Sequence, residues 1–478
     1  MRIHLSKQTT ALICVVAAIL IYFINPFQVN PEGAKVIALA SLLIGLWITE
    51  ALPMPVTALL PLILFPLLGV ANIKTTAASY ANEVIFLFMG GFMLGLAIEK
   101  WNLHRRIALN IVRLTGTSGN RIILGFIIST GLISMWLSNT ATTMMMFPIA
   151  MSVVKVIEEN HSHKKGVVNF ATSIMIAIAL ASNFGGIATL IGTPPNVAYA
   201  SFISDNVHYT ISFANWMLVC TPLAVLLLLI FYFVMVKWLY PNGMRSDETT
   251  QMVIHNEIAA LGKISLPEKR VFIIFVCTAL LWITKDLLNK LTPLKLDDNM
   301  IAIIGATALF ITPNGKDKEA LLQWQDTKNM AWGILLLFGG GIALANALEK
   351  AGLIGELGNW FTQFSFHSLL LIFLVTVISL FISEVMSNIA QVIVFAPVVT
   401  TLAKATGMHP LQLGIPMTLA ASCASMLPMG TPPNAIAFSS GYIKLKDMTK
   451  VGLVMNVISV ILITLFCWLL LPLAFSLK

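Results

Sequence analysis

The sequence carries little charge for its length. Only 10% of its 478 residues are Asp, Glu, Lys or Arg, whereas 58% are hydrophobic. A soluble domain has roughly 25% charged residues, so an ordinary soluble protein is excluded. Many separate stretches approach the ~20 apolar residues that a helix needs to cross a bilayer. We therefore predict an all-α protein that spans the membrane many times.

Cysteine is also scarce. All five cysteines lie in apolar segments, and no two have the C-x-x-C spacing of a metal or redox motif. This argues against a disulfide framework and against structural zinc. Residues 1–27 begin with basic side chains and continue into an apolar run without a clear small-residue cleavage site, so we expect an uncleaved first span.

The net charge of +8 is explained by the orientation of the chain in the membrane and not by a nucleic-acid partner. With the amino terminus placed in the cytoplasm, most of the 29 lysine and arginine residues fall on the cytoplasmic side, as the positive-inside rule requires. We predict eleven transmembrane helices in a plasma membrane, which put the carboxyl terminus outside. The expected spans are residues 10–26, 33–49, 52–72, 83–99, 168–205, 211–236, 271–285, 299–312, 330–348, 413–441 and 451–475.

Two further apolar stretches, 122–154 and 366–403, are expected to form re-entrant hairpins. Arg113 and Arg121 precede the first stretch and Lys155 follows it, so both of its ends are assigned to the cytoplasm. A segment with both ends on one side must enter the membrane and return. Two short spans, or one long kinked span, are the alternatives that the sequence leaves open.

The chain contains an internal repeat. Four pairs of segments recur in one order: LWIT at 46–49 and 281–284, LFMGGFMLGLAIEKWNL at 87–103 and LFGGGIALANALEKAGL at 337–353, SNTATTMMMFP at 138–148 and SNIAQVIVFAP at 387–397, and GTPPN at 192–196 and 430–434. We interpret them as a duplicated unit. The predicted parts are an N-terminal transmembrane helix (1–30), a first repeat (31–240) with its helix broken at 191–196, a cytoplasmic linker (241–267), and a second repeat (268–478) broken at 429–434.

The two copies are predicted to have opposite orientations in the membrane. Five crossings separate the start of the first copy from the start of the second, and an odd offset turns the second copy upside down. Inverted repeats with interrupted helices are typical of secondary transporters, whose substrate and ion sites lie where the repeats meet. An ion channel is the alternative from another class, since re-entrant segments also occur in pores.

Each TPPN motif is predicted to break a membrane helix. Pro194 and Pro195 remove hydrogen bonds from the carbonyls of Leu190 and Ile191, and Thr193 is suited to cap a new helix that starts at Pro194. The half-helix that ends there presents carbonyls to a cation, and the half-helix that begins there presents amides to an anion. Backbone exposed at this depth must be buried in protein or line a cavity.

Uncharged polar residues occupy the predicted hairpin tips. SNTATT at 138–143 and SNIA at 387–390 supply hydroxyls and amides, and segments 122–154, 371–403 and 413–443 contain no Asp, Arg or His. An anion bound there must be neutralised by helix ends, amides and a co-bound cation, for which Na+ is suited because the ligands are oxygens. No histidine lies beside these motifs, so the base or metal of a hydrolase is missing and we predict no enzyme.

With these paired SN and GTPPN motifs, the sequence resembles the divalent anion/sodium symporter family, which includes bacterial and animal dicarboxylate, citrate and sulfate transporters. The resemblance extends over essentially the whole chain. It implies a homodimer in the bacterial inner membrane, in which a scaffold holds an elevator-like transport domain. It also implies uptake of di- or tricarboxylates such as succinate, malate, fumarate or citrate, with Na+ as the coupling ion.

The resemblance further implies the residues of the site. Carried over by position, the first sodium site comprises Ser134, Ser138, Asn139 and Gly192, and the second comprises Ser383, Met386, Asn388 and Gly430. The substrate is expected between the hairpin tips, in contact with Asn139, Thr140, Thr193, Asn388, Thr431 and Pro432.

One position departs from the family pattern. Ile389 stands where the second motif often has a threonine, so a hydroxyl that holds one substrate carboxylate is missing. We expect a longer or less symmetric substrate, or an altered affinity. Sodium-independent exchange of dicarboxylates and symport of sulfate stay open as alternatives, although no basic residue lies beside either motif to replace sodium. Glu384, close to the second SN motif, is left without an assigned role.

Overall fold

The computed structural model describes residues 6–160, 165–244, 248–293, 295–315, 319–353, 367–475 and 477. In these residues the regular structure is helical, apart from one isolated bridge between Pro313 and Ala320, and the all-α prediction is confirmed. The α-helices are α1 (Lys7–Ile24), α2 (Pro31–Thr49), α3 (Met54–Leu67), α4 (Ile73–Ala78), α5 (Glu83–Lys100), α6 (Leu103–Thr115), α7 (Gly119–Ser134), α8 (Asn139–Asn160), α9 (Lys165–Gly186), α10 (Pro194–Val207), α11 (Phe213–Phe233), α12 (Glu248–Ala260), α13 (Leu266–Leu291), α14 (Asp298–Ile311), α15 (Trp332–Lys350), α17 (Ser368–Ser383), α18 (Asn388–Ala405), α19 (Pro410–Ser422), α20 (Pro432–Phe438) and α21 (Leu445–Ala474). Three short helical turns, η1 (Ser79–Ala81), η2 (Val234–Leu239) and η3 (Trp324–Asn329), complete the described elements.

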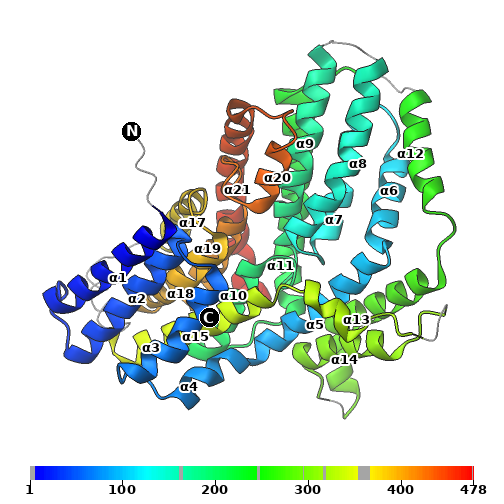
Figure 1. Ribbon diagram of the computed structural model, residues 1–478. Helices are drawn as coiled ribbons and strands as arrows, with labels where there is room; N and C mark the ends of the chain where they lie inside the picture. Colours follow the sequence, from blue (N-terminus) through cyan, green and yellow to red (C-terminus); the bar gives the residue numbers. More distant parts are fainter. Residues whose placement is uncertain are drawn as a thin grey trace.

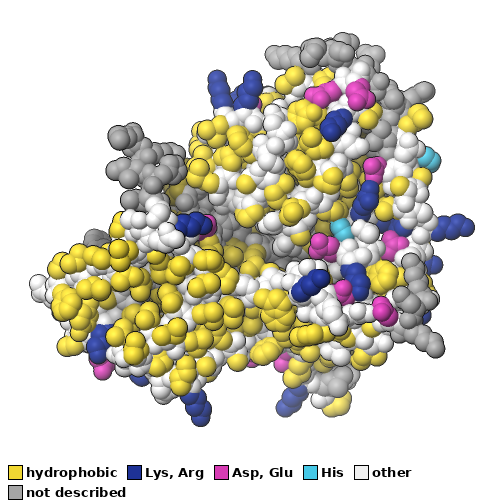
Figure 2. Space-filling model, in the orientation of Figure 1, with side chains coloured by type: hydrophobic (Ala, Val, Ile, Leu, Met, Phe, Trp, Pro, Cys, Tyr) yellow, Lys and Arg dark blue, Asp and Glu magenta, His cyan; other side chains and the backbone are white. Residues whose placement is uncertain are grey.

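Ten of the described helices are long and apolar enough to cross a membrane, and α3, α7, α14 and α17 are shorter apolar helices beside them. Much of this apolar surface faces outward: only Ala18 of α1 is buried, and hydrophobic side chains cover the lower left of the molecule in Figure 2. The chain is therefore a multi-pass membrane protein. The number of crossings and their direction stay predictions.

The helices form two groups. In the first, which we call the frame, α1 packs on α2, α3 on α15, and α5 and α13 on α14. In the second, the hairpin group, α7 and α8 pack on α9, α17 and α18 pack on α19, and α21 joins α11, α17 and α19. In Figure 1 the hairpin-group helices α8, α9 and α21 rise above α5, α13 and α14, and α17, α18 and α19 lie beside α1 and α2. Helix α10 contacts both groups.

Both stretches predicted as hairpins consist of two helices joined by a short turn. The turn of the first covers residues 135–138 and that of the second covers 384–387. The two helices of each pair contact each other, which rules out one long kinked span. Residue 366, where the second hairpin was expected to begin, lies outside the described residues.

Both predicted helix breaks are present, and the first is wider than expected. α10 begins at Pro194 with Thr193 at its N-cap position, as predicted, but the Thr193 side chain makes no capping hydrogen bond. However, α9 has already ended at Gly186, so the expectation that the prolines alone interrupt the helix at Leu190 and Ile191 is corrected. The second break lies between α19 and α20.

The first hairpin lies closely against the end of α9. A Cβ atom on Gly185 would lie 2.2 Å from the carbonyl oxygen of Gly131 on α7. A Cβ atom on Gly186 would lie 2.2 Å from Oδ1 of Asn139. Glycine at both positions therefore lets the hairpin backbone and its tip lie directly against the end of α9.

The predicted linker 241–267 is not a free polar loop, because it contains α12. Arg106 of α6 holds its end: the guanidinium donates to the carbonyls of Leu261 (3.1 Å) and Gly262 (2.9 Å) and pairs with Glu268 at 2.9 Å. Such a fork of donors suits carbonyls and a carboxylate together. The linker is thereby attached to the start of α13.

Polar contacts far from the tips join the two halves of the hairpin group. The Tyr442 hydroxyl donates to Glu158 (2.8 Å), and Thr172 donates to the Tyr442 carbonyl (3.0 Å). The Tyr240 hydroxyl donates to Asp447 (2.9 Å). Segments from both halves are thus bonded into one unit around the tips.

Candidate binding site of a membrane transporter

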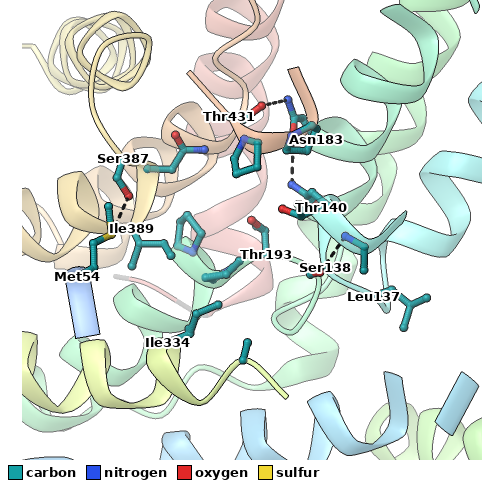
Figure 3. Close-up of a pocket in the computed structure, with 18 of the residues that line it drawn as sticks. Met54, Leu137, Ser138, Thr140, Asn183, Thr193, Ile334, Ser387, Ile389 and Thr431 are labelled. Atoms are coloured by element: carbon teal, nitrogen blue, oxygen red, sulfur yellow. Dashed lines mark hydrogen bonds between the residues drawn. The ribbon is translucent and has the colours of Figure 1, made fainter. Parts of the chain in front are cut away.

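A cavity of about 810 Å³ lies where the two hairpin tips and the two helix breaks meet. Figure 3 shows its residues pointing inward from the hairpin group, with Met54 and Ile334 contributed by the frame. Its uncharged polar lining consists of Thr49, Ser138, Asn139, Thr140, Asn183, Thr193, Asn329, Ser387, Asn388 and Thr431. Apolar residues that include Phe92, Leu96, Leu137, Ile389 and Met429 complete much of the wall.

At the first hairpin tip, three oxygen atoms converge behind the cavity wall. Ser134 Oγ lies 2.8 Å from Asn139 Oδ1 and 2.8 Å from the carbonyl oxygen of Ser182. The hydroxyl has a single proton, so it can satisfy only one of these acceptors at a time. Ser134 is fully buried, and such a cluster of neutral oxygens suits a hard monovalent cation.

The backbone beside this cluster adds further oxygens. A Cβ atom on Gly192 would lie 2.4 Å from the carbonyl oxygen of Gly186 and 3.0 Å from those of Ser134 and Met135. The space over Gly192 is therefore a cradle lined by carbonyls, which any side chain would fill. Ser138, in contrast, faces the cavity and accepts a hydrogen bond from the amide of Ala141 (3.3 Å).

The second hairpin tip repeats this arrangement. Ser383 Oγ lies 2.7 Å from Asn388 Oδ1 and 2.6 Å from the carbonyl oxygen of Ala421. Ser383 is fully buried, whereas the predicted ligands Met386, Asn388 and Gly430 line the cavity. Corresponding residues thus make matching contacts in the two halves of the chain.

The asparagine of each TPPN motif spans its helix break. Asn196 Nδ2 donates to the carbonyls of Thr189 (2.8 Å) and Gly186 (3.5 Å). Asn434 Nδ2 donates to the carbonyls of Leu427 (3.1 Å) and Ala424 (3.5 Å). Both asparagines are fully buried, so each amide supplies donors to carbonyls that a broken helix leaves without partners.

All six residues expected to contact substrate line the cavity, and three of the expected sodium ligands lie behind its wall. The six are Asn139, Thr140, Thr193, Asn388, Thr431 and Pro432; the three are Ser134, Gly192 and Ser383. The helices α8, α10, α18 and α20 all begin at the cavity, so the positive ends of their dipoles are nearby. First-turn amides come from α8 and α18, because α10 and α20 each begin with two prolines, which have no N–H. The lining contains no Lys, Arg or His in the described part of the chain.

Two buried residues of this region were not assigned a role from the sequence. Asn183 lines the cavity and contacts both halves of the chain. Glu384 lies at the second tip, where its carboxylate accepts hydrogen bonds from the amides of Ser425 (2.8 Å), Met426 (2.9 Å) and Leu427 (3.0 Å). Its position three residues before Ser387 was visible in the sequence, but its acceptor role depends on a distant loop.

The Glu384 carboxylate stabilises the second helix break. It also accepts from Asn456 Nδ2 of α21 (2.7 Å), and the residue is only 4% exposed. Several hydrogen bonds from backbone amides compensate for burial of a carboxylate. A Cβ atom on Gly430 would lie 3.3 Å from Glu384 Oε2, so the negative charge is also close to a predicted ligand of the second sodium site.

The fold and the cavity together define a multi-pass membrane transporter, with a polar site between two broken helices and two hairpin tips. Comparison with protein families agrees with this class. The model of the sodium:sulfate symporter transmembrane region matches residues 5–474, and the chain belongs to this family. The resemblance drawn from the SN and GTPPN motifs is confirmed, as is the prediction that the protein is a transporter and not an enzyme.

Two curated relatives are similar to the chain over most of their length. The chain is 38% identical over 456 residues to the sodium-dependent dicarboxylate transporter SdcS of Staphylococcus saprophyticus, with 94% of this chain and 88% of that protein covered. It is 38% identical over 458 residues to SdcS of Staphylococcus aureus strain USA300, with the same coverage.

Two solved structures share the fold at low sequence identity. The Alcanivorax borkumensis YdaH transporter aligns with a TM-score of 0.52 at 12% identity, over 84% of this chain and 88% of that one. Neisseria gonorrhoeae MtrF aligns with a TM-score of 0.55 at 14% identity, over 83% of each chain. At these identities the likeness concerns the fold alone.

The replacement Glu384→Ala is expected to destabilise the protein. It leaves the amides of Ser425, Met426 and Leu427 buried without their acceptor, and each such loss costs about 1–3 kcal/mol. The thermal unfolding midpoint of the purified protein in detergent should therefore fall clearly below that of the wild type. Glu349→Gln, at the exposed end of α15, is the control and should unfold like the wild type. Equal midpoints for Glu384→Ala and the wild type would contradict the proposed contact role.

Proposed function

We propose that the protein is a sodium-coupled symporter that imports dicarboxylates such as succinate, malate or fumarate, and tricarboxylates such as citrate, into a bacterial cell. The single observation that carries the proposal is the pair of matching oxygen clusters at the hairpin tips, next to a cavity lined by helix amino termini. Oxygen clusters suit sodium, and helix amino termini with side-chain amides suit carboxylates. The names of the SdcS relatives, which are sodium-dependent dicarboxylate transporters, support the same function.

The cation part of the proposal assigns one sodium ion to each tip. The first ion takes oxygens of Ser134, Asn139 and Ser182 with the carbonyls around Gly192. The second takes the corresponding oxygens of Ser383, Asn388 and Ala421. Because the described cavity lining has no basic side chain, these ions provide the positive charge that accompanies the dianion.

The substrate part of the proposal places one carboxylate at each tip, and the two tips offer it different polar groups. On the first tip, Asn139 and Thr140 offer an amide and a hydroxyl at the start of α8. On the second, Asn388 is followed by Ile389, whose apolar side chain lines the cavity in place of a hydroxyl. The second carboxylate therefore relies on Asn388, Ser387 and the amides at the start of α18.

Uptake of labelled succinate into proteoliposomes tests the function. With an inward sodium gradient, we expect succinate to accumulate; with potassium or choline in place of sodium, it should not, because the oxygen clusters then hold no suitable cation. Unlabelled succinate, citrate and sulfate are added in parallel as competitors, and empty liposomes serve as the control.

Each alternative gives its own result in this assay. Uptake that is independent of sodium but requires dicarboxylate inside the vesicle indicates an exchanger and contradicts the two sodium sites. Competition by sulfate that is stronger than that by succinate indicates a sulfate symporter. Flux that neither saturates nor accumulates against a gradient indicates a channel.

Replacing Ile389 by threonine is expected to tighten the binding of short, symmetric dicarboxylates. The new hydroxyl supplies the missing partner for the second carboxylate, and one hydrogen bond to a charged group is worth about 1.5–3 kcal/mol. The Michaelis constant for succinate should therefore fall about tenfold, at 1.4 kcal/mol per factor of ten. Ile389→Val removes volume without adding a hydroxyl and is the matched control. If both variants shift the constant equally, the hydroxyl has no such role.

For the transport step, we propose that the hairpin group moves as a unit relative to the frame, in the manner of an elevator. The hydrogen bonds of Tyr442 and Tyr240 hold the hairpin group together. We assign α10 to the hairpin group for this step, because it packs on α18 and α19. Its polar contacts with the start of α5 are few: Ser201 donates to Asn82 (3.0 Å), Ser204 donates to Glu83 (3.1 Å), and Asn82 donates to Asp205. These contacts must break if the hairpin group slides past the frame.

A cross-link between the two groups is therefore expected to stop transport. In a background with Cys14→Ser and Cys277→Ser, which removes the two cysteines that are not buried, Glu83→Cys and Ser204→Cys are joined by a short bifunctional thiol reagent. Uptake should be lost while succinate still binds, since the cavity lining is untouched. The two single-cysteine variants control for labelling. Undiminished uptake after complete cross-linking contradicts the elevator step.

The homodimer, the inverted orientation of the repeats and the cytoplasmic amino terminus are retained as parts of the proposal. Light scattering of the detergent-solubilised protein measures the first, and a monomer mass contradicts it. Labelling of single cysteines from each side of the membrane measures the other two. Labelling of both hairpin bases from the same side contradicts the inversion.

A further inference from the structure

We infer that Asn183 is a positioning residue that couples sodium binding at the first hairpin tip to the shape of the second helix break. Asn183 lies near the end of α9, is fully buried, and faces the cavity (Figure 3). It is not one of the ligands proposed above. The inference rests on the proposed sodium-coupled function and assigns a role within it.

The side chain of Asn183 contacts both halves of the chain at once. Its Oδ1 accepts a hydrogen bond from Asn139 Nδ2 at 3.4 Å. Its Nδ2 donates to Thr431 Oγ1 at 3.2 Å and to Asn434 Oδ1 at 3.3 Å. An asparagine amide has two N–H donors and one carbonyl, so all three groups are in use.

Each partner of Asn183 has a function of its own. Asn139 presents its Oδ1 to Ser134 in the first oxygen cluster, so its Nδ2 is the end that remains for Asn183. Thr431 caps α20, where its Oγ1 accepts from the amide of Asn434. Asn434 in turn holds the carbonyls of the second break through its own amide, including that of Leu427 at 3.1 Å. A continuous chain of hydrogen bonds thus runs from the first oxygen cluster to the second break.

The lengths of these bonds leave room for them to tighten. Contacts of 3.2–3.4 Å lie at or just beyond the long end of the range for N–H···O hydrogen bonds, whose most frequent length is about 2.9–3.0 Å. A sodium ion that takes Oδ1 of Asn139 fixes the orientation of that amide and polarises its N–H groups. The bond to Asn183 then strengthens, and Asn183 orients Thr431 and the start of α20 toward the substrate.

The second half of the chain lacks an equivalent bridge. Asn183 follows Ser182, whose carbonyl accepts from Ser134, and Ser422 follows Ala421, whose carbonyl accepts from Ser383. By this contact Ser422 is the counterpart of Asn183. By the carbonyls that Asn196 and Asn434 hold, the counterpart is Ala421, which has no polar side chain. The Ser422 hydroxyl is fully buried and has no hydrogen-bond partner in the part of the chain that the structure describes. Coupling through this position consequently runs from the first site to the second break.

The test measures the affinity of the purified protein for succinate at low and at saturating sodium, with choline replacing sodium. The ratio of the two dissociation constants reports the coupling between ion and substrate, and couplings of this kind span about 5–150-fold. For the wild type we expect a ratio above about tenfold, and for Asn183→Ala a ratio reduced at least about fivefold. By reciprocity, succinate should raise the apparent sodium affinity of the variant by an equally reduced factor.

Two further variants separate coupling from stability. Asn183→Asp retains the volume and the acceptor for Asn139 but loses both donors, so it should also reduce the ratio even if Asn183→Ala folds poorly. Ser422→Ala, the counterpart in the second half, should leave the ratio at the wild-type value. The inference is overturned if both variants at 183 keep the wild-type ratio, or if Ser422→Ala lowers the ratio as much as they do. A wild-type ratio of one would instead reject the proposed sodium coupling itself.

Discussion

A helix that stops partway across a membrane leaves backbone carbonyls and amides without partners, and the rest of this structure depends on how those groups are satisfied. Water is scarce there, so the partners must come from the protein. Asn196 and Asn434 each donate to two carbonyls of the break that precedes them. The cavity, the four helix starts around it and the approach of the hairpin tips all require these breaks to hold their shape.

The two halves of the chain satisfy these backbone groups with similar, but not identical, side chains. Both use a serine at the end of a hairpin helix, the asparagine after the tip and a carbonyl of the neighbouring helix. The second break has an additional acceptor in Glu384, which binds three consecutive amides, whereas the first half has Met135 at the corresponding place before its SN motif. The oxygen cluster at the first tip is therefore built from neutral groups, whereas the one at the second tip lies beside a carboxylate. The two tips also differ because Ile389 in the second SN motif takes the position that Thr140 has in the first.

Much of this organisation was predictable from the sequence because it depends on local rules. Proline pairs interrupt helices, threonine precedes them, and recurring motifs mark a duplication, so the breaks and tips were found at the correct segments. The end of α9 at Gly186 was missed, and so were the close contacts there of Gly185 with Gly131 and of Gly186 with Asn139, because they join residues far apart in the chain. Asn183 and the partners of Glu384 were missed for the same reason, since contacts such as Asn183–Thr431 join residues far apart in the chain. The helix α12 was not predicted, because the polar composition of residues 241–267 suggested a loop.

The chemistry of the cavity wall has a consequence for the response to pH. Asparagine, serine and threonine do not titrate, and histidine is the side chain whose ordinary pKa falls between about 5 and 8. The described lining contains no histidine, and its two carboxylates, Glu50 and Glu99, belong to exposed residues at helix ends. Acidity in the physiological range therefore acts mainly on the solute: each proton that a dicarboxylate gains removes a negative charge that the helix starts and the proposed sodium ions would otherwise meet. The pH dependence of transport through a cavity with such a wall therefore reports which ionic form of the solute is carried.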